Sequence, residues 1–501
     1  MRKNISLEKE YKELKRKIKL YNEKCDFDMV DKAWEFAKLA HYGQIRASGS
    51  PYNVHSLKTA EKLAEWRLDT TSIVVGLLHD TVEKGGANRK DIQEMFGEDM
   101  ESLVDGVTEI SKIKLKGSDE ELFVENLRKM FIAMAKDIRV VIVRLAERYH
   151  NMETLSFMSR GHQVRISKET AEVFAPLAER LGMGEVQGGL EDLAFPYLHP
   201  KEHRKVIEKS KKYFANNKSR IEKMKTNITR SLAKEKINAE IRSRAKHVYS
   251  LWRKLERPGI DWDFDKVHDI VALRVLVGKV EDCYSTLGLI HKLYKPVLEL
   301  GIKDYIARPK PNGYRSIHTR VFGEKLHLTE IQIRTFDMHE QAEFGVAAHW
   351  AYTDVKKQAK VHADVLEKSG VTAKEDKLKW VKELAKWQKE IVDSEEFLKA
   401  VKLDALSERI YVFSPKGDVY DLPLHATPVD FAYTVHTGLG EYIQGAKVNG
   451  RLVALNSKLH SGDVVEIIKS KNIKKPSHGW IDFVVTTTAK RKIKTQLRLD
   501  N

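Results

Sequence analysis

Apolar residues recur at steps of three and four positions from about Asp28 to Leu190, in segments such as DKAWEFAKLAH, TTSIVVGLLHDTVEK and DIRVVIVRLAERYHNMETL. This spacing gathers the apolar side chains on one face of a helix, which can then pack on other helices. The run DTTS, which begins at Asp69, precedes the second segment and supplies good N-cap residues. The first part of the chain is therefore predicted to be all-helical.

The pattern changes after a charged helical stretch, KEHRKVIEKSKKYFANNKSRIEKMK. From about Ala239 to Tyr352, helical segments alternate with β-branched runs that are typical of strands: HDIVALRVLV, YRSIHTRVF and KLHLTEIQIRT. From Arg409 onward, short strands alternate with turns, and Pro415-Lys416-Gly417 and Asn449-Gly450 favour hairpins. The sequence thus predicts a mixed α/β domain followed by a small β-rich module.

A chain of 501 residues is too long for one core and corresponds to roughly three domains. We assign 1–195 to the helical domain, 196–355 to the mixed domain, 356–404 to a polar linker with an amphipathic helix, 405–470 to the β-rich module and 471–501 to the start of a further helical region.

The chain is basic, with a net charge of +16, which favours an acidic partner such as a nucleotide, a nucleic acid or a membrane surface. A basic protein without such a partner is the alternative. Cys25 and Cys283 are the only cysteines, which argues against a disulfide framework and a cysteine metal site. Neither a signal peptide nor an apolar run long enough to span a membrane is evident, so we expect a soluble, cytoplasmic protein without a membrane partner.

A rigid loop is predicted in the segment KDYIARPKPNGYRSIHT. Pro309 and Pro311 argue against a helix or a central strand, and Asn312-Gly313 favours a turn. The loop would deliver Tyr314 to the start of a strand that runs to Phe322. An aromatic face among cations suits a base that carries phosphates, whereas a solvated basic hairpin loop is the plain alternative. The surrounding cations are Lys303, Arg308, Lys310 and Arg315.

Histidines and carboxylates recur in the helical domain. An adjacent His-Asp pair, with another histidine and a carboxylate from distant helices, is a ligand set for a divalent ion that activates water, and it suits Mn²⁺ or similar ions. Helix caps or satisfied polar groups of the core are the alternative. Arg46 and Ser48 lie in a Gly-containing loop that can hold phosphate. The ligand candidates are His55 in PYNVH, His79 and Asp80 in GLLHD, and Glu147, His150 and Asn151 in LAERYHN.

The segment RSRAKHVYSLWRK is predicted to form one cation-rich helix. Lys246, Ser250, Arg253 and Lys254 would then share one face, with Arg244 near the helix start. Such a face suits a triphosphate, although a solvated helix surface explains the pattern equally well.

Two carboxylates lie at or beside apolar strands: Asp269 in HDIVALRV and Glu330 in LTEIQIRT. A carboxylate among buried residues costs free energy unless it has a partner, which Mg²⁺ would supply. Phosphoryl transfer needs a metal on the phosphates, cations around them, and a carboxylate that accepts the proton of the attacking hydroxyl.

Together these motifs resemble those of the long RelA/SpoT family, whose members make and degrade (p)ppGpp. The resemblance runs in family order from about Lys32 to Lys490. It rests on AHYGQIRASGSPYNVH, LLHDTVEK, RVVIVRLAERYHNMETL, RAKHVYSLWRKL, DIVALRV, KDYIARPKPNGYRSIHT, EIQIRTFDMHEQAEFGVAAHWAY and RIYVFSPKGDVYDLPLHATPVDFAYTVHT. It implies a multidomain fold of α and α+β class: an all-helical HD-type hydrolase domain, a mixed α/β nucleotidyltransferase-like synthetase domain and a small β-grasp-like TGS domain.

The resemblance also implies roles for residues of the synthetase domain. Asp269 and Glu330 would be catalytic and hold Mg²⁺, with Glu330 activating the ribose 3′-hydroxyl. Tyr314 would stack on the guanine of GDP or GTP. ATP and the acceptor would be bound by Arg244, Lys246, Ser250, Lys254, Lys303, Lys310, Asn312, Tyr314, His318, Gln332 and Arg334.

In the hydrolase domain the resemblance implies a catalytic Glu83 and the binding of (p)ppGpp by Arg46, Ser48 and Asn151. His436, in AYTVHT, matches the residue that meets the tRNA acceptor end, so uncharged tRNA and the ribosome are expected partners of the TGS domain. The implied Mn²⁺ ligands are His55, His79, Asp80 and Glu147.

Three positions depart from the family pattern. Glu147 stands where the family usually has Asp, and Lys84 follows Glu83 where Asp is usual. Gly301 replaces the arginine of an Arg-x-Lys-Asp motif, here GIKD, which keeps its Lys-Asp pair and so favours the substrate mode of bifunctional members. The chain stops after TQLRLDN, before the further regulatory modules expected of long members.

The leading prediction is pyrophosphate transfer from ATP to the 3′-hydroxyl of GDP or GTP, beside an impaired (p)ppGpp hydrolase. Glu147 and Lys84 predict metal binding with slow hydrolysis; if Lys84 pointed into solvent and Glu147 repositioned, hydrolysis would be normal. Two alternatives are a hydrolase with an idle synthetase and a catalytically silent ribosome or tRNA adapter. Intact Asp269, Tyr314 and Glu330 speak against the silent adapter.

Overall fold

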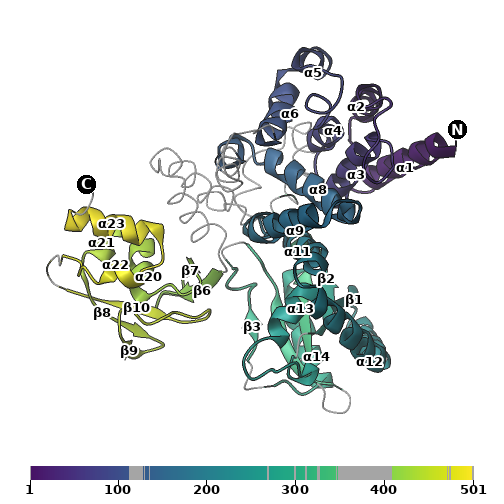
Figure 1. The fold of residues 1–501 in the computed structure, drawn as a ribbon. Helices are drawn as coiled ribbons and strands as arrows, with labels where there is room; N and C mark the ends of the chain where they lie inside the picture. The colour runs from purple at the N-terminus through teal and green to yellow at the C-terminus, as the bar shows by residue number, and fades with distance from the viewer. Residues whose placement is uncertain are drawn as a thin grey trace. The chain divides into compact units, whose positions relative to one another are not determined.

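Figure 1 shows the fold of the chain in a computed structural model. The chain forms two compact units, one within residues 1–374 and one that comprises 375–501 with the short segments 117–125 and 310–312. The residues that the structure describes are 2–111, 128, 130–134, 136–267, 270–297, 301–310, 313–323, 328–345, 347, 409–470, 472 and 475–498. Asp269, Asn312 and the linker 356–404 lie outside them.

The first part of the first unit is helical, as predicted. Asp69 caps α4 (Thr70–Leu78) by accepting a bond from the backbone N–H of Ser72 at 2.9 Å. α4 is almost wholly buried and contacts α2, α3, α6 and α8, so its C-terminal end lies inside the helical domain. The other helices are α1 (Arg2–Lys19), α2 (Phe27–Ala40), α3 (Asn53–Glu65), α5 (Arg89–Phe96), α6 (Glu98–Ser111), α8 (Arg139–Glu153), the 3₁₀ turn η1 (Leu155–Phe157), α9 (Arg160–Glu169), the π-helical turn η2 (Thr170–Phe174), α10 (Ala175–Arg180) and α11 (Gly184–Leu198).

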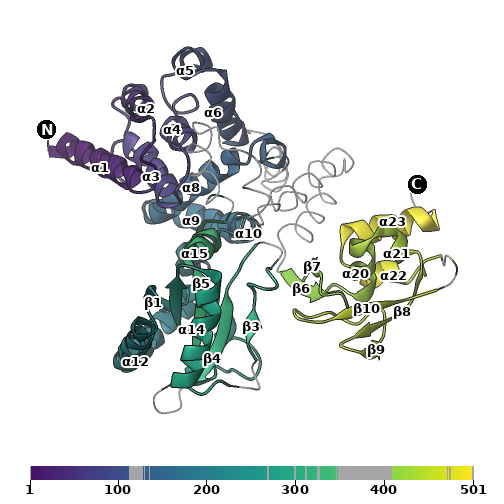
Figure 2. The ribbon, with the colours of Figure 1, turned by 180° about the vertical axis from the view of Figure 1, so that it is seen from behind.

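A five-stranded sheet with the order β1-β2-β5-β4-β3 follows, in which β2 pairs with β5 in parallel and the other described pairs are antiparallel. In Figure 2, β4 and β5 lie side by side next to α14. The elements are α12 (Pro200–Lys234), β1 (Ala239–Ala245), α13 (Val248–Leu255), the 3₁₀ turn η3 (Phe264–Lys266), β2 (Val271–Val277), α14 (Val280–Leu293), β3 (Lys303–Asp304), β4 (Ile317–Phe322), β5 (Leu328–Thr335) and α15 (Phe336–Phe344).

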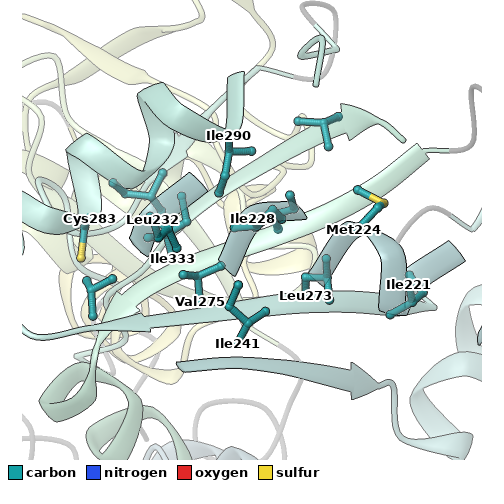
Figure 3. Packing of buried hydrophobic residues seen from close by; sticks show 14 residues of the cluster. Ile221, Met224, Ile228, Leu232, Ile241, Leu273, Val275, Cys283, Ile290 and Ile333 are labelled. Atoms are coloured by element: carbon teal, nitrogen blue, oxygen red, sulfur yellow. The ribbon is translucent and has the colours of Figure 1, made fainter. Parts of the chain in front are cut away.

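The two faces of this sheet differ in chemistry. Figure 3 shows apolar strand residues packed against α12 and α14 in one core: Ile241, Leu273, Val275 and Ile333 meet Ile221, Met224, Ile228 and Ile290. Because side chains alternate along a strand, the residues between them point to the other face. There the cross-strand rows are Arg244–Ala272–Glu330–Arg320 and Arg242–Arg274–Gln332–His318–Lys303.

The prediction of one helix over RSRAKHVYSLWRK was wrong in its first half. Arg244 lies on β1, opposite Ala272 of β2, and the helix α13 begins only at Val248. Pairing with β2 gives this segment backbone partners that a periodicity argument over so short a run does not detect. The cations of the segment therefore do not share one helix face. The strand predicted to start at Tyr314 likewise begins at Ile317.

The second unit contains a hairpin and a three-stranded sheet of order β10-β8-β9. Both predicted hairpin turns are confirmed: Gly417 lies between β6 and β7, and Asn449 and Gly450 join β8 to β9 with φ of 51° and 80°. Positive φ at both central residues suits the twist of a two-residue hairpin. The elements are β6 (Arg409–Phe413), β7 (Val419–Pro423), α20 (Pro428–Val435), α21 (Thr437–Gly440), β8 (Ile443–Val448), β9 (Arg451–Val453), β10 (Val465–Lys469), α22 (Trp480–Phe483) and α23 (Thr487–Leu497).

α23 packs directly on the β-rich module. Ala489 and Ile493 of α23 share a core cluster with Val429 and Ala432 of α20. Asp430 is fully buried and accepts bonds from the backbone N–H groups of Thr486 at 2.7 Å and Val485 at 2.9 Å, which joins the two parts. Among the described residues, no helix is both long enough and apolar enough to cross a bilayer.

Two candidate active sites

Three predicted ligands converge in the helical domain. His55 lies on α3, and His79 and Asp80 follow the last residue of α4. Asp80 Oδ2 lies 3.6 Å from His55 Nε2 and 3.4 Å from His79 Nε2, and the two ring nitrogens lie 3.3 Å apart. Each residue is only about 1% exposed. Two imidazoles and a carboxylate whose donor atoms all lie within 4.8 Å fit a divalent ion of the N/O-binding class.

The pKa values of the two histidines shift in opposite directions, and that of His79 is raised because Asp80 outweighs the effect of burial. Burial holds the pKa of His55 well below its ordinary value, so its ring is neutral and can offer a lone pair. His79 Nδ1 lies 2.9 Å from the carbonyl oxygen of Gly76, which fixes the ring orientation and turns Nε2 toward the cluster.

Glu147, the fourth predicted ligand, is not part of this cluster in the structure. Its carboxylate pairs with Arg144 one turn earlier on α8, and it accepts a bond from Asn151 Nδ2 at 3.3 Å. Burial by itself would raise the pKa of Glu147, but Arg144 and His79 outweigh it and hold the pKa below its ordinary value.

Lys84 turns its ammonium onto Asp80, while 39% of its side-chain surface stays exposed. Its Nζ lies 3.0 Å from both carboxylate oxygens of Asp80. Burial would lower the pKa of Lys84, but Asp80 and Glu147 raise it, so the ammonium stays charged. The neighbouring Glu83 is half-buried, and its Oε2 has no hydrogen-bond partner among the residues that the structure describes. Burial raises the pKa of Glu83, with Asp80 and Glu147 adding to it.

Two of the predicted phosphate ligands, Arg46 and Asn151, are linked to the metal cluster through His150. Arg46 donates to Asn151 Oδ1 at 2.8 Å and lies 3.4 Å from His150 Nδ1. His150 Nδ1 in turn lies 2.7 Å from His55 Nδ1, which links these residues to the metal ligands. Ser48 is bonded within its own loop, to Ser50 Oγ at 2.7 Å.

Tyr52 is a functional candidate that the sequence reasoning missed. Its hydroxyl donates to Asp80 Oδ2 at 2.7 Å. The only signal was its place three residues before His55 in PYNVH, which does not show where the side chain points.

In the mixed domain, Glu330 lies on the polar face of the sheet and is 6% exposed. Its Oε1 accepts a bond from Gln332 Nε2 at 3.0 Å and lies 3.3 Å from His318 Nδ1. Its Oε2 lies 3.4 Å from Arg320 Nε. Arg320 was missed, although it lies two residues after His318 and therefore on the same face of β4.

Tyr314 joins this group through His318. The Tyr314 hydroxyl lies 2.7 Å from His318 Nε2. Tyr305, which was also missed, packs edge-on against both rings, with centroid distances of 6.0 Å to Tyr314 and 5.4 Å to His318. The predicted aromatic residue therefore stands in a fixed aromatic group that reaches Glu330.

The predicted phosphate-binding cations occupy different elements. Arg244 on β1 lies 3.4 Å from Glu185 of α11, and Lys246 lies in the short connection between β1 and α13. Ser250 and Lys254 lie on α13, and Lys303 is exposed on β3. Lys310 is grouped with the second unit.

Arg334 lies in a buried charge cluster rather than at an open surface. It is 1% exposed, donates to Glu343 Oε1 at 2.9 Å and lies 2.7 Å from His339 Nδ1. Arg274 lies 3.0 Å from the same Glu343 oxygen, and burial beside Arg334 lowers the pKa of Arg274 to about 10. The guanidinium of Arg334 also lies 5.9 Å from the ring centroid of Tyr314. In this conformation Arg334 holds α15 against the sheet.

In the second unit, His436 is exposed rather than packed in a core. Its Nδ1 accepts a bond from the backbone N–H of Gly438 at 3.1 Å, at the start of α21. This bond fixes the ring at the surface.

Three family models match the chain in order: the HD domain over residues 33–184, the region found in RelA/SpoT proteins over 243–357 and the TGS domain over 410–469. Curated relatives align with nearly the whole chain. A GTP pyrophosphokinase of Myxococcus xanthus is 44% identical over 95% of this chain and 61% of its own length.

Two further relatives carry different names. A guanosine-3′,5′-bis(diphosphate) 3′-pyrophosphohydrolase of Aquifex aeolicus is 43% identical over 94% of this chain and 64% of its own length. A bifunctional (p)ppGpp synthase/hydrolase of Mycobacterium tuberculosis is 43% identical over 94% of this chain and 62% of its own length. The chain thus spans about three fifths of the length of these relatives. The order of the three domains and these identities show that the chain belongs to the long RelA/SpoT family.

Proposed function

We propose that this chain transfers pyrophosphate from ATP to the 3′-hydroxyl of GDP or GTP at the polar face of its five-stranded sheet. The observation that carries the proposal is the connected group Tyr314–His318–Glu330, which joins an aromatic side chain to a nearly buried carboxylate. Phosphoryl transfer requires a positioned acceptor and a base for its hydroxyl, and this group supplies both.

Glu330 is the base in this proposal. The ribose 3′-oxygen attacks the β-phosphorus of ATP, its proton passes to Glu330, and AMP leaves with the electrons of the broken phosphoanhydride bond. His318 and Gln332 hold the Glu330 oxygen that they share at 3.3 Å and 3.0 Å, so the carboxylate keeps its orientation without being fully neutralised. Arg320 adds positive charge on the other oxygen.

Tyr314 provides the stacking face for the guanine, with Arg334 behind the ring. Gln332 Oε1 is buried and has no hydrogen-bond partner among the described residues. Such an oxygen costs free energy unless it is satisfied, and an acceptor nucleotide could supply the donor.

The polar face also fits a hard divalent ion. Glu330 and the unsatisfied Gln332 Oε1 are oxygen ligands in adjacent positions of one strand face, and oxygen is what Mg²⁺ prefers. Glu330, with Asp269, would hold Mg²⁺, which when bound would neutralise the charge of the ATP phosphates.

The test is incubation of the full chain with β-³²P-labelled ATP, Mg²⁺ and either GDP or GTP. Labelled ppGpp or pppGpp is expected from the wild type and only traces from Glu330→Gln. If the wild type makes no labelled product with either acceptor, the proposed synthesis is wrong.

A second activity is favoured by the convergence of His55, His79 and Asp80. We propose that the helical domain removes the 3′-pyrophosphate of (p)ppGpp when Mn²⁺ is bound. In this proposal Arg46 and Asn151 bind the phosphates, and Glu83 orients the attacking water. The pairing of Lys84 with Asp80 supports slow turnover. Pyrophosphate release from ppGpp with Mn²⁺, abolished by His79→Ala, would test this activity.

The second unit is proposed to bind uncharged tRNA, and through it the ribosome. The exposed ring of His436, fixed by its bond to Gly438 N, supports this role. A catalytically silent adapter is disfavoured, since an idle site gives no reason to keep Glu330 nearly buried among cations.

A further inference from the structure

The ammonium of Lys84 forms an ion pair with Asp80, the carboxylate that a metal at this cluster would need. We infer that Lys84 is a built-in competitor of the divalent ion, so that the cluster of His55, His79 and Asp80 takes a metal only when the lysine ammonium leaves Asp80. This inference rests on the proposal that the cluster binds a metal, and it names the residue that sets the affinity of the cluster for that metal.

The lone pairs of Asp80 Oδ2 are already engaged. A carboxylate oxygen has two, and Asp80 Oδ2 already accepts from the Tyr52 hydroxyl at 2.7 Å and from Lys84 Nζ at 3.0 Å. The same oxygen faces His79 Nε2 at 3.4 Å and His55 Nε2 at 3.6 Å. An ion shared by the two imidazoles would therefore bond to Oδ2, and one of the two present donors has to leave that oxygen.

Lys84 is the donor that can leave. The Tyr52 ring stacks on His41 with centroids 4.6 Å apart, and its hydroxyl carries no charge. The Lys84 side chain is 39% exposed, ends a flexible stem and carries a positive charge that repels a divalent cation.

The movement is confined to the side chain. The backbone N–H of Lys84 donates to the carbonyl oxygen of Asp80 at 2.9 Å, and the Lys84 carbonyl accepts from Gln44 Nε2 at 2.7 Å. The site therefore has two arrangements on one backbone: the ammonium on Asp80 without a metal, or the metal on Asp80 with the ammonium turned toward solvent. In the second arrangement the ammonium is available to a phosphate oxygen of the substrate.

The test is titration of the full chain with Mn²⁺ in the absence of nucleotide, with free Mn²⁺ followed by electron paramagnetic resonance. Lys84→Met removes the charge and keeps an apolar stem, while Lys90→Met removes an exposed lysine of α5 as a matched control. Lys84→Met is expected to bind Mn²⁺ about tenfold more tightly than the wild type, because both competition and repulsion are removed. Lys90→Met and the charge-preserving Lys84→Arg are expected to bind like the wild type.

Adding His79→Ala to Lys84→Met is expected to abolish the gain, which separates this site from Mn²⁺ held at the sheet. Equal affinities of wild type and Lys84→Met, or a gain that survives His79→Ala, would overturn the inference. If Lys84→Met does not fold, as judged by circular dichroism, Lys84→Gln carries the same expectations. Absence of Mn²⁺ binding in every variant would overturn both the competitor role and the metal-dependent hydrolysis, whereas the synthesis assay with Glu330→Gln is independent of all these outcomes.

Discussion

The hydroxyl of Tyr314 lies 2.7 Å from Nε2 of His318. The other nitrogen of that imidazole lies 3.3 Å from Glu330, so one ring connects the proposed stacking residue to the proposed base. Tyr314 and Glu330 of strand β5 are thereby held in one geometry before any nucleotide binds. Preorganisation of this kind reduces the ordering that a substrate must provide.

Glu330→Gln is expected to remove pyrophosphate transfer while nucleotide affinity stays nearly unchanged. The amide keeps the shape and the contact with Gln332 but cannot accept the 3′-hydroxyl proton. Turnover measured with saturating ATP and GDP, beside nucleotide binding by calorimetry, checks this. Turnover near that of the wild type would show that Glu330 is not the base.

Tyr314→Ala is expected to weaken acceptor binding by roughly 1–3 kcal/mol, since it removes the stacking face. Tyr314→Phe keeps the ring and removes the hydroxyl that contacts His318, so it should raise the KM for GDP much less. The KM values for GDP and ATP in both variants provide the measurement. An unchanged KM for GDP in Tyr314→Ala would favour a solvated basic loop.

Wild-type hydrolysis of ppGpp with Mn²⁺ is expected to be slow, and the double variant Lys84→Asp with Glu147→Asp is expected to be faster by about tenfold or more. Aspartate at position 84 cannot hold Asp80 as an ion pair, and the shorter carboxylate at 147 follows the family pattern. Initial rates of pyrophosphate release decide the matter. Brisk wild-type hydrolysis that the double variant does not improve would contradict the prediction.

His436→Ala is expected to lower the affinity of the chain for uncharged tRNA. Binding should also weaken steeply with added salt, because Lys and Arg contacts to phosphate release counterions. Filter binding or fluorescence anisotropy at several salt concentrations measures both effects. If the affinity of His436→Ala matches that of the wild type, the exposed ring has no part in RNA binding.

Stability is expected to fall as the pH rises through about 9, because of His247. Its Nδ1 lies 2.8 Å from Asp192 and its Nε2 3.3 Å from Glu185. Burial would lower the pKa of His247, but these carboxylates outweigh it and raise the pKa to about 9. Because the folded pKa lies above the unfolded value of about 6.5, protonated His247 stabilises the fold. This contribution is complete below a pH of about 6.5 and is lost as the pH rises through the folded pKa.

The loss in the free energy of unfolding when His247 is deprotonated amounts to at most about 3 kcal/mol. Thermal unfolding of wild type and His247→Gln between pH 6 and 10 provides the check, with the Tm of the wild type expected to fall more steeply. Parallel Tm curves for the two proteins would show that the charge on His247 does not contribute.

Much of the architecture could be predicted because it depends on local patterns. Helical periodicity, the cap at Asp69 and the Asn449-Gly450 turn each act over a few residues, and the structure has all three. The proximity of His79 and Asp80 at a helix end could likewise be predicted, because adjacent residues stay adjacent in any fold.

The sequence by itself therefore determined most of the element types and the adjacency of His79 and Asp80. Tertiary structure alone decided that Arg244 pairs on a strand, that Arg334 is held by Glu343 of α15, and that Lys84 turns onto Asp80. The reason is physical: a strand edge, a buried guanidinium and a flexible ammonium each take the partner that distant segments place within reach, and local spacing does not contain that information.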